Sequence, residues 1–546
     1  MTLFFGFVVA TFLTMVLIPP LARAARSLHA TDQPGERKVH ETTMPRLGGI
    51  AMAVGAIVPL ILWAPLDRQA VAILAGIGII VCFGVWDDMR HLDYRIKFAG
   101  QIAAVLVVIL AGDVVIRFVP FAGVAPLPDW VAVPLTAFAL VGVTNALNLA
   151  DGLDGLAGGI TLLSLAAISA LAYLSGERGF VLFAALSIIG GILGFLRFNT
   201  YPARIFMGDG GSQFLGFAAG ILVVLLTQQV STALSPALPL LILGLPIVDT
   251  MLVMAERLHE GRSPFVADRK HVHHRLLALG FHHYEAVLAI YAAQSAFIVL
   301  AYALRFESDA LILGIYGGCL AVGVAFLKAA PRLGWHLHLC AAQHSMPAIP
   351  RWIAWLRRDQ RILRTAFQGA VVAIPAFFLA GAFLVPDVPR DIGALAGVLL
   401  VGLLALYVRC RHGPFNVVEK AIVYVAAMCV VYLVQRSPAP VTGLRVCYGV
   451  LFATMAVAVV VGFRVGRERF RITPMDFLVI FIAVAVPNLP DLQLDVQHLG
   501  VAVGMIIVLL YSIELVLNGL WRRWDLMRLT TYATLAVLGL RGLSGS

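Results

Sequence analysis

Charged residues are scarce in this chain. Only 13% of its 546 residues are Asp, Glu, Lys or Arg, whereas 60% are hydrophobic. Soluble globular chains are about 25% charged and about 45–50% apolar, and disordered chains contain even fewer apolar residues. The composition therefore excludes an ordinary soluble protein and a disordered one. It predicts that most of the chain lies in a lipid bilayer.

Cysteine is sparse too, and no CxxC pair occurs. The six cysteines lie mostly in or beside apolar runs. We therefore expect them to act as small apolar residues, not as a disulfide framework or a zinc site. The chain also lacks a Walker A element and the motifs of protein kinases. A phosphate donor would thus not be bound in the manner of those enzymes.

Long apolar runs make up most of what is present. A membrane-spanning helix needs about 20 predominantly apolar residues, and about 17 segments meet that criterion. The predicted fold class is an all-α polytopic membrane protein. No positively charged stretch precedes the first segment, so we expect it to remain as a span with its N-terminus outside. The segments lie near residues 1–22, 48–64, 69–86, 98–117, 130–147, 156–175, 179–196, 212–228, 235–255, 284–304, 309–327, 365–385, 391–408, 418–435, 444–463, 473–489 and 500–520.

The charge that is present is unevenly distributed. Lys and Arg number 40 against 30 Asp and Glu, a net charge of +10. Nucleic-acid binding and the positive-inside rule both predict such an excess. When the loops alternate from the first segment, about 32 basic residues fall on one side and about 7 on the other. The richer side is therefore predicted to be cytoplasmic, with anionic membrane lipids rather than nucleic acid as partners.

Five polar loops lie on this predicted cytoplasmic side. The first, DQPGERKVHETTMPRLGG, includes Lys38 among basic groups that suit an anionic ligand, although the positive-inside rule alone also explains it. The second, WDDMRHLDYRIKFAGQ, contains Asp87, Asp88 and Lys97. Two adjacent carboxylates favour a bound cation or a raised pKa. The alternative is a helix cap followed by local salt bridges.

The third loop, TNALNLADGLDGLAGG, interleaves polar residues with glycines. Asn145, Asn148, Asp151 and Asp154 are spaced by three, which places them on one face if the segment is helical. Carboxylate and amide oxygens together suit Mg²⁺. The glycines allow a ligand to approach the backbone closely. A simple turn is the alternative for the DGLDG part.

The fourth loop, RFNTYPARIFMGDGGSQFLG, places Asp209 in a Gly-rich turn before an apolar span. Free backbone N–H groups at such a turn can bind an anion, and Asp209 could hold a metal that bridges to it. A glycine turn with a capping aspartate is the alternative. Phe206 could stack on a base, although an aromatic side chain beside a span more often packs against other apolar groups.

The fifth loop contains an HxHH run of His271, His273 and His274, with Arg262 and other cations nearby. Phosphate binding is favoured over zinc, because no Cys or further carboxylate stands at zinc spacing. Asp249 lies within the preceding apolar segment. A carboxylate inside a membrane indicates function unless it makes a packing hydrogen bond.

Taken together, the loops collect oxygen ligands, a Gly-rich turn and many cations at one membrane face. This inventory indicates Mg²⁺-dependent phosphoryl transfer between a soluble nucleotide and a phosphorylated lipid, without identifying a sugar. A transporter is the alternative class. Its site would lie near the bilayer midplane, often between inverted repeats, and no repeat relates the two halves of this chain.

Four motifs resemble those of the polyprenyl-phosphate N-acetylhexosamine-1-phosphate transferases, specifically the WecA/TagO-like branch, with MraY as a more distant relative. The resemblance covers about residues 1–330, for which the family predicts about 10–11 spans. Val272 interrupts the three consecutive histidines of MraY-type enzymes, so a muramoyl-pentapeptide substrate is not expected. The motifs are Asp87-Asp88, NxxNxxDGxDGL from Asn145 to Leu156, FMGDxGS from Phe206 to Ser212, and HxHH from His271 to His274.

This resemblance implies a reaction. A sugar 1-phosphate, most simply GlcNAc-1-phosphate, passes from a UDP-sugar to undecaprenyl phosphate, and UMP is released. The product starts a lipid-linked cell-envelope glycan. Mg²⁺ is the implied cofactor, with Mn²⁺ as a substitute, and a modified UDP-N-acetylhexosamine is the alternative donor. The implied location is the bacterial cytoplasmic membrane, with the active site on its cytoplasmic face.

Residue roles follow from the same resemblance. Asp209 and Asn148 would hold the metal, and Asp87 and Asp88 would act near the lipid phosphate, one of them as a base. Asp154 and Phe206 would recognise the uracil. The expected catalytic set is Asp87, Asp88, Asp209, His271, His273 and His274; Lys38, Lys97, Asn145, Asp151, Asp154, Phe206 and Arg262 would bind substrate, with Lys38, Lys97 and the histidines on phosphates.

Three regions are predicted along the chain. Residues 1–330 form the transferase core, residues 331–364 an interfacial amphipathic linker, and residues 365–546 a transmembrane extension of about six spans. The core does not need this extension. The extension could dock a downstream glycosyltransferase or a flippase, form a homodimer, or shape the lipid entrance.

Overall fold

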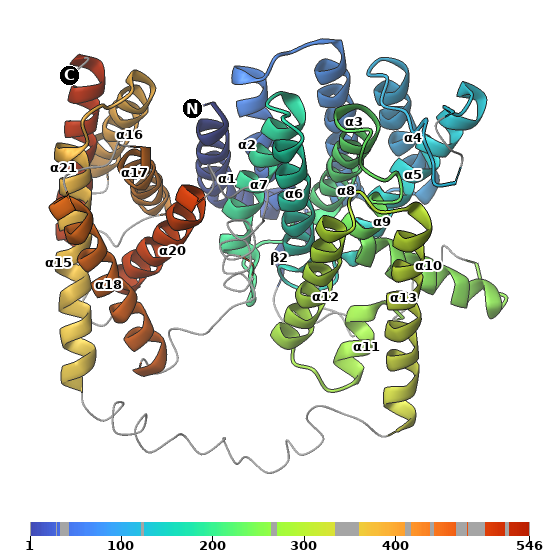
Figure 1. Ribbon diagram of the computed structural model, residues 1–546. Helices are drawn as coiled ribbons and strands as arrows, with labels where there is room; N and C mark the ends of the chain where they lie inside the picture. The colour runs from blue at the N-terminus through green and yellow to red at the C-terminus, as the bar shows by residue number, and fades with distance from the viewer. Residues whose placement is uncertain are drawn as a thin grey trace. The chain divides into compact units, whose positions relative to one another are not determined.

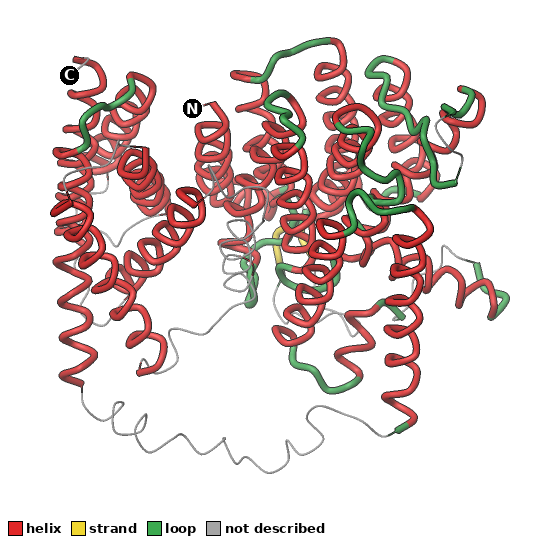
Figure 2. The backbone as a smooth tube through the Cα atoms, viewed as in Figure 1, coloured by secondary structure: helices red, strands yellow, loops and turns green. Residues whose placement is uncertain are grey.

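The computed structural model describes residues 2–28, 30–32, 43–121, 125–263, 270–333, 360–409, 417–436, 442–465, 478, 497–518 and 524–544. Helices dominate these residues (Figure 2). The strands found there are β1 (Thr31–Asp32) and β2 (Met44–Pro45), which pair antiparallel. Eleven helices of the described part are long and apolar enough to cross a membrane. The predicted all-α polytopic class is confirmed, whereas the count of 17 spans is not.

Contacts divide the chain into two compact units. Unit 1 comprises residues 1–341 with 473–478, and unit 2 comprises residues 342–472 with 479–546. Unit 1 contains α1 (Thr2–Ser27), α2 (Gly48–Trp63), α3 (Arg68–Arg90), α4 (Tyr94–Leu110), α5 (Asp129–Ala150), α6 (Leu156–Leu174), α7 (Phe180–Asn199), α8 (Gly208–Leu225), the π-helix η1 (Leu226–Val230), α9 (Pro239–Ile242), α10 (Gly244–His259), α11 (Val272–Ala278), α12 (His283–Ala303) and α13 (Asp309–Arg332). Unit 2 contains α15 (Gln360–Leu384), α16 (Arg390–Arg409), α17 (Val417–Arg436), α18 (Thr442–Val465), α20 (Gln497–Asn518) and α21 (Trp524–Ser544).

Helix α8 is the central element of unit 1. It packs against α2, α3, α5 and α6 (Figure 1). Glycines allow this close approach at its N-terminus. A Cβ on Gly49 would lie 2.3 Å from the Cα of Gly211, and one on Gly84 would lie 2.4 Å from the Cα of Gly210. Because no side chain separates these backbones, α2 and α3 converge on the start of α8 and bring their polar ends together.

The segment predicted as one span near residues 235–255 is divided into α9 and α10. Side chains from other helices satisfy the interrupted backbone, as is common for broken helices in membranes. The carbonyl of Ile242 accepts from Ser164 Oγ at 2.7 Å and from Gln294 Nε2 at 2.8 Å. Pro246 lies in the first turn of α10, where its missing N–H costs nothing. The predicted segment is therefore not one continuous helix.

Two further segments bear on the predicted spans. Helix α21 lies beyond the last predicted span and was not expected; it is not among the eleven span-like helices. Its arginines, Arg528 and Arg541, and several threonines reduce its apolar character. The predicted span at 473–489 lies outside the described residues except for Leu478.

Candidate active site

Asp88 joins the end of α3 to the start of α8. Its Oδ1 accepts the backbone N–H of Asp209 at 2.9 Å, and its Oδ2 accepts that of Gly210 at 3.1 Å. The first N–H groups of a helix have no partner within it, and a buried carboxylate there also interacts favourably with the helix dipole. Gly208, with φ +70°, permits the turn, and a Cβ there would lie 2.3 Å from Asp88 Oδ2. Asp88 therefore caps α8 and fixes Asp209.

Lys97 on α4 links the other two carboxylates. Its ammonium group forms an ion pair with Asp87 and lies 3.1 Å from Asp209 Oδ2. Asp87 also accepts the N–H of Leu92 at 2.7 Å. Asn148 Nδ2 donates to Asp209 Oδ1 at 3.2 Å. Four predicted site residues, from α3, α4, α5 and α8, thus meet around the Asp209 carboxylate, whose side chain is 32% exposed.

Asn145 lies in a different network. Its Nδ2 donates to Gln101 Oε1 at 2.7 Å, and Gln101 Nε2 donates to Gln213 Oε1 at 3.1 Å. These amides brace α5 against α4 and α8. Sequence reasoning missed Gln101 and Gln213, because a glutamine in an apolar helix shows no motif until the helices pack.

The DGLDG segment is a turn between α5 and α6. The expectation of one polar helical face holds for Asn145 and Asn148 but fails beyond Ala150, where α5 ends. Gly155, with φ +80°, adopts a left-handed conformation that favours glycine. Asp154 Oδ2 accepts the N–H of Ala203 at 2.9 Å, so this carboxylate tethers the loop before α8.

Asp151 follows α5 directly and is repelled by the negative charges of two nearby aspartates, Asp209 and Asp154. Burial, together with the negative charges of Asp209 and Asp154, raises the pKa of Asp151 to about 7. A carboxyl group in this state can gain or lose a proton near neutral pH. A cation close to it would favour its ionised form.

The histidine run contacts the same turn. A Cβ on Gly152 would lie 2.2 Å from His273 Nε2, so this glycine leaves the space that the imidazole fills. Burial, helped by the neighbouring His274, lowers the pKa of His273 to about 3. His273 is therefore a neutral hydrogen-bonding group at neutral pH and not a cation. The ring of His274 lies 4.2 Å from that of His273.

Asp249 positions the first histidine. Its Oδ2 accepts from His271 Nδ1 at 2.9 Å, and its Oδ1 accepts the N–H of Val272 at 2.8 Å. The carboxylate thereby caps α11 and orients the His271 ring. Of the two alternatives that the sequence left open for Asp249, the structure shows the packing hydrogen bond, and its partner is a residue of the HxHH run.

Three predicted residues remain, and the structure describes two of them, Arg262 and Phe206. Arg262 pairs with Glu260 at 2.9 Å and is 43% exposed. The backbone of Phe206 joins β2 to the start of α2: its N–H donates to Pro45 O at 2.8 Å, and its carbonyl accepts from Gly48 at 3.0 Å. Lys38 lies outside the described residues.

The donor set fits a divalent cation of the Mg²⁺ type. Asp87 and Asp209 provide carboxylate oxygens beside Lys97, and Asn148, whose Nδ2 donates to Asp209, carries an amide oxygen in the same group. Mg²⁺ prefers such oxygen ligands and usually retains waters or substrate phosphates. Within the described residues, no group of three or more His, Cys, Asp or Glu side chains is arranged so that it could hold a metal ion by itself. A cation here would therefore complete its coordination with water and substrate.

Comparison with known proteins gives consistent matches. The sequence model of Glycosyl transferase family 4 matches residues 70–227. The chain is 38% identical over 302 residues to a probable undecaprenyl-phosphate N-acetylglucosaminyl 1-phosphate transferase of Bacillus subtilis (strain 168), covering 55% of this chain and 84% of that relative.

Two further relatives agree. A decaprenyl-phosphate N-acetylglucosaminephosphotransferase of Mycobacterium tuberculosis (strain ATCC 25618 / H37Rv) is 35% identical over 312 residues, which are 52% of this chain and 77% of the relative. An undecaprenyl-phosphate alpha-N-acetylglucosaminyl 1-phosphate transferase of Escherichia coli (strain K12) is 29% identical over 278 residues, which are 49% of this chain and 74% of the relative. The family match includes Asp87, Lys97, Asn148 and Asp209.

Proposed function

Because the chain belongs to the polyprenyl-phosphate N-acetylglucosaminyl 1-phosphate transferases of Glycosyl transferase family 4, we propose that the site around Asp209 transfers GlcNAc-1-phosphate from UDP-GlcNAc to a polyprenyl phosphate. An oxygen of the lipid phosphate attacks the phosphorus that carries the sugar. A phosphoanhydride bond forms, the phosphoanhydride bond to UMP breaks, and UMP leaves. The observation that carries the proposal is the convergence of Asp87, Lys97 and Asn148 on Asp209.

The two adjacent aspartates have different roles in this proposal. Both oxygens of Asp88 accept backbone N–H groups at the start of α8, so Asp88 positions Asp209. Asp87 pairs with Lys97 and is the residue available to take a proton from the lipid phosphate. Lys97 then offsets the negative charge that accumulates between the two reacting phosphates.

Asp209 and Asn148 would hold Mg²⁺, which would supply positive charge on the diphosphate of the donor. His273, kept neutral by burial beside Gly152, would donate a hydrogen bond to a phosphate oxygen without repelling nearby cations. Holding both phosphates in line would also lower the activation barrier through proximity, since a bimolecular step becomes effectively unimolecular.

The location of the site supports the choice of substrates. The reacting side chains lie at helix ends, where a soluble nucleotide and a lipid phosphate can meet, and not at mid-helix as transport would require. We place this end of unit 1 at the cytoplasmic face of a bacterial cytoplasmic membrane. The excess of Lys and Arg in the loops on that side supports the placement.

The test is a UMP-release assay on the purified chain in detergent. Undecaprenyl phosphate, Mg²⁺ and either UDP-GlcNAc or UDP-GalNAc would be supplied in parallel. Lipid-dependent release with UDP-GlcNAc, abolished by a chelator and restored by Mg²⁺, is the expected result. Absence of release from folded protein with every donor tried would overturn the proposal. Release that a chelator leaves unchanged would overturn the Mg²⁺ requirement alone.

A further inference from the structure

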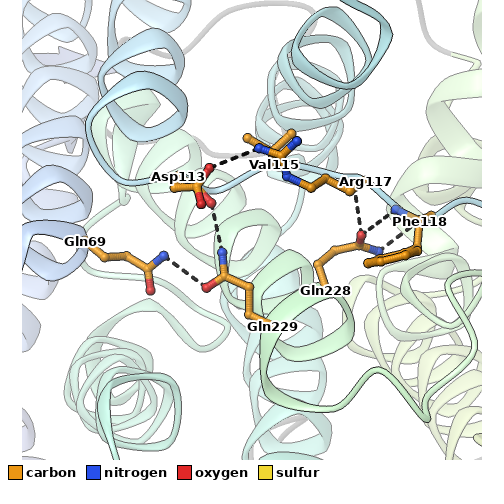
Figure 3. A pocket seen from close by; sticks show the side chains of 7 residues that line it. All are labelled: Gln69, Asp113, Val115, Arg117, Phe118, Gln228 and Gln229. Carbon is orange, nitrogen blue, oxygen red and sulfur yellow. Dashed lines mark hydrogen bonds and ion pairs between the residues drawn. The ribbon is translucent and has the colours of Figure 1, made fainter. Parts of the chain in front are cut away.

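A second polar site lies at the opposite end of unit 1. A cavity of about 280 Å³ is lined by Gln69 of α3, by Gln228 and Gln229 of η1, and by Asp113, Arg117 and Phe118 of the segment after α4 (Figure 3). From Gln69 to Asp87, α3 rises about 27 Å at about 1.5 Å per residue, close to the thickness of a bilayer core. The cavity therefore faces the membrane surface opposite the carboxylate site.

Exposed aromatic side chains place this end at the lipid headgroups. Trp63 closes α2 and Trp130 begins α5, and both helices have their other end at the carboxylate site. Trp130 is 79% exposed, and Phe121, in the same connection as Arg117, is 71% exposed. Exposed tryptophans of membrane proteins concentrate at the membrane–water interface. The cavity thus lies at headgroup depth.

Glutamine side chains hold the cavity walls in place. Gln69 Nε2 donates to Gly112 O at 2.8 Å and to Gln229 Oε1 at 3.0 Å, and Gln229 Nε2 donates to Asp113 O at 2.8 Å. Gln228 Oε1 accepts the N–H groups of Arg117 and Phe118 (Figure 3). These bonds fix the backbone of the segment that carries Asp113 and Arg117.

The charged groups at the cavity suit a ligand with both signs of charge. Arg117 pairs with Asp113 at 3.4 Å and with Asp129 at 2.5 Å. The two carboxylates are 77% and 74% exposed. These pairs use two of the five N–H groups of a guanidinium, and a carboxylate accepts several hydrogen bonds. A phosphate can therefore bind Arg117 while an ammonium group binds Asp113, which lines the cavity, and Asp129, which lies beside it as the other partner of Arg117.

We propose that this cavity binds the headgroup of a zwitterionic phospholipid that carries a primary ammonium group, such as phosphatidylethanolamine, from the leaflet opposite the carboxylate site. An anionic headgroup would meet two carboxylates and only one guanidinium. A quaternary ammonium has no N–H to donate to Asp113 or Asp129. The inference does not depend on the transfer reaction at the other face.

The test compares lipids bound to the purified, delipidated full-length chain by native mass spectrometry. Phosphatidylethanolamine, phosphatidylcholine and phosphatidylglycerol with identical acyl chains would be titrated separately. Preferential retention of phosphatidylethanolamine is expected. Asp113→Asn should lower that retention about tenfold, since it removes a charge-assisted hydrogen bond. Asn tolerates the positive φ of 51° at this position, so the backbone should persist.

Asp391→Asn is the matched control, because it makes the same charge change at an exposed position on α16. It should leave the lipid preference unchanged. Equal retention of the three lipids, or unchanged retention in Asp113→Asn, would overturn the proposal. Soluble phosphoethanolamine that binds as tightly as the lipid would overturn the assignment to a lipid headgroup.

Discussion

Asp88 holds Asp209 through the backbone, with Oδ1 at 2.9 Å from the N–H of Asp209 and Oδ2 at 3.1 Å from that of Gly210. The residues are far apart in the sequence, yet one determines the orientation of the other. The neighbouring Asp87 turns instead to Lys97. Two adjacent carboxylates that look equivalent in the sequence therefore have different partners, and the proposed function gives them different roles.

This division predicts different effects of two similar substitutions. Asp88→Asn should lower stability by about 1–3 kcal/mol, because an amide cannot accept both N–H groups and leaves one buried donor unpaired. Asp87→Asn should abolish turnover in protein that still folds, because it removes the carboxylate that pairs with Lys97. Thermal unfolding and UMP release measured on both variants would check this. Full turnover in folded Asp87→Asn protein would contradict the division of roles.

Lys97 is predicted to act through charge. Lys97→Met should lower kcat by about 10²–10³-fold, the cost of losing one preorganised electrostatic contact in a transition state. Lys97→Arg should retain part of the activity, because it preserves the positive charge. Steady-state UMP release for both variants across a Mg²⁺ titration would test this. Full activity of the Met variant would show that the charge is not required.

Gly152 is predicted to be required because of His273. Gly152→Ala places a Cβ 2.2 Å from His273 Nε2, so the imidazole must move and activity should fall steeply. Gly142→Ala is the control. Gly142 lies on α5, shortly before Gly152, and a Cβ on it would meet nothing within 4 Å. A double-mutant cycle with His273→Ala should show strong coupling. Additive effects would mean that the two residues do not act together.

Asp151 should make stability depend on pH. Its pKa of about 7 in the folded chain lies above the ordinary value of 3.8, so the folded state retains a proton that the unfolded state loses. Stability should therefore fall as pH rises from about 4 to about 7 and then level off. Asp151→Asn should reduce this fall. The measurement is the unfolding midpoint as a function of pH across that range, for the Asp151→Asn variant and for the unsubstituted chain. The same dependence on pH in both proteins would refute the assignment.

Unit 2 contains a buried ion pair between α17 and α21. Arg528 donates to both carboxylate oxygens of Glu419 at 3.1 Å, and the side chains are 11% and 6% exposed. Glu419→Gln removes the buried carboxylate that neutralises the guanidinium and should destabilise the protein by about 3–5 kcal/mol. Asp525→Asn, at a 97% exposed partner of the same arginine, should have little effect. Chemical or thermal unfolding of the two variants would distinguish them.

The sequence by itself determined the membrane class, most of the helices and the family. Apolar runs of about 20 residues specify spans because the bilayer leaves few alternatives, and the motifs are local. It also identified Asp87, Lys97, Asn148 and Asp209 as candidate site residues, and the structure brings these four together.

Only the tertiary structure decided which partners each of these side chains has. The different partners of Asp87 and Asp88, the neutral state of His273 and the placement of Asn145 beside Gln101 depend on contacts between helices. The break before α10 also depends on contacts between helices, because Ser164 and Gln294 donate hydrogen bonds to the backbone carbonyl that the break leaves open. Burial and hydrogen bonding across these contacts depend on how closely the backbones pack at residues such as Gly49, Gly84 and Gly152. The spacing of residues along the chain does not indicate this packing.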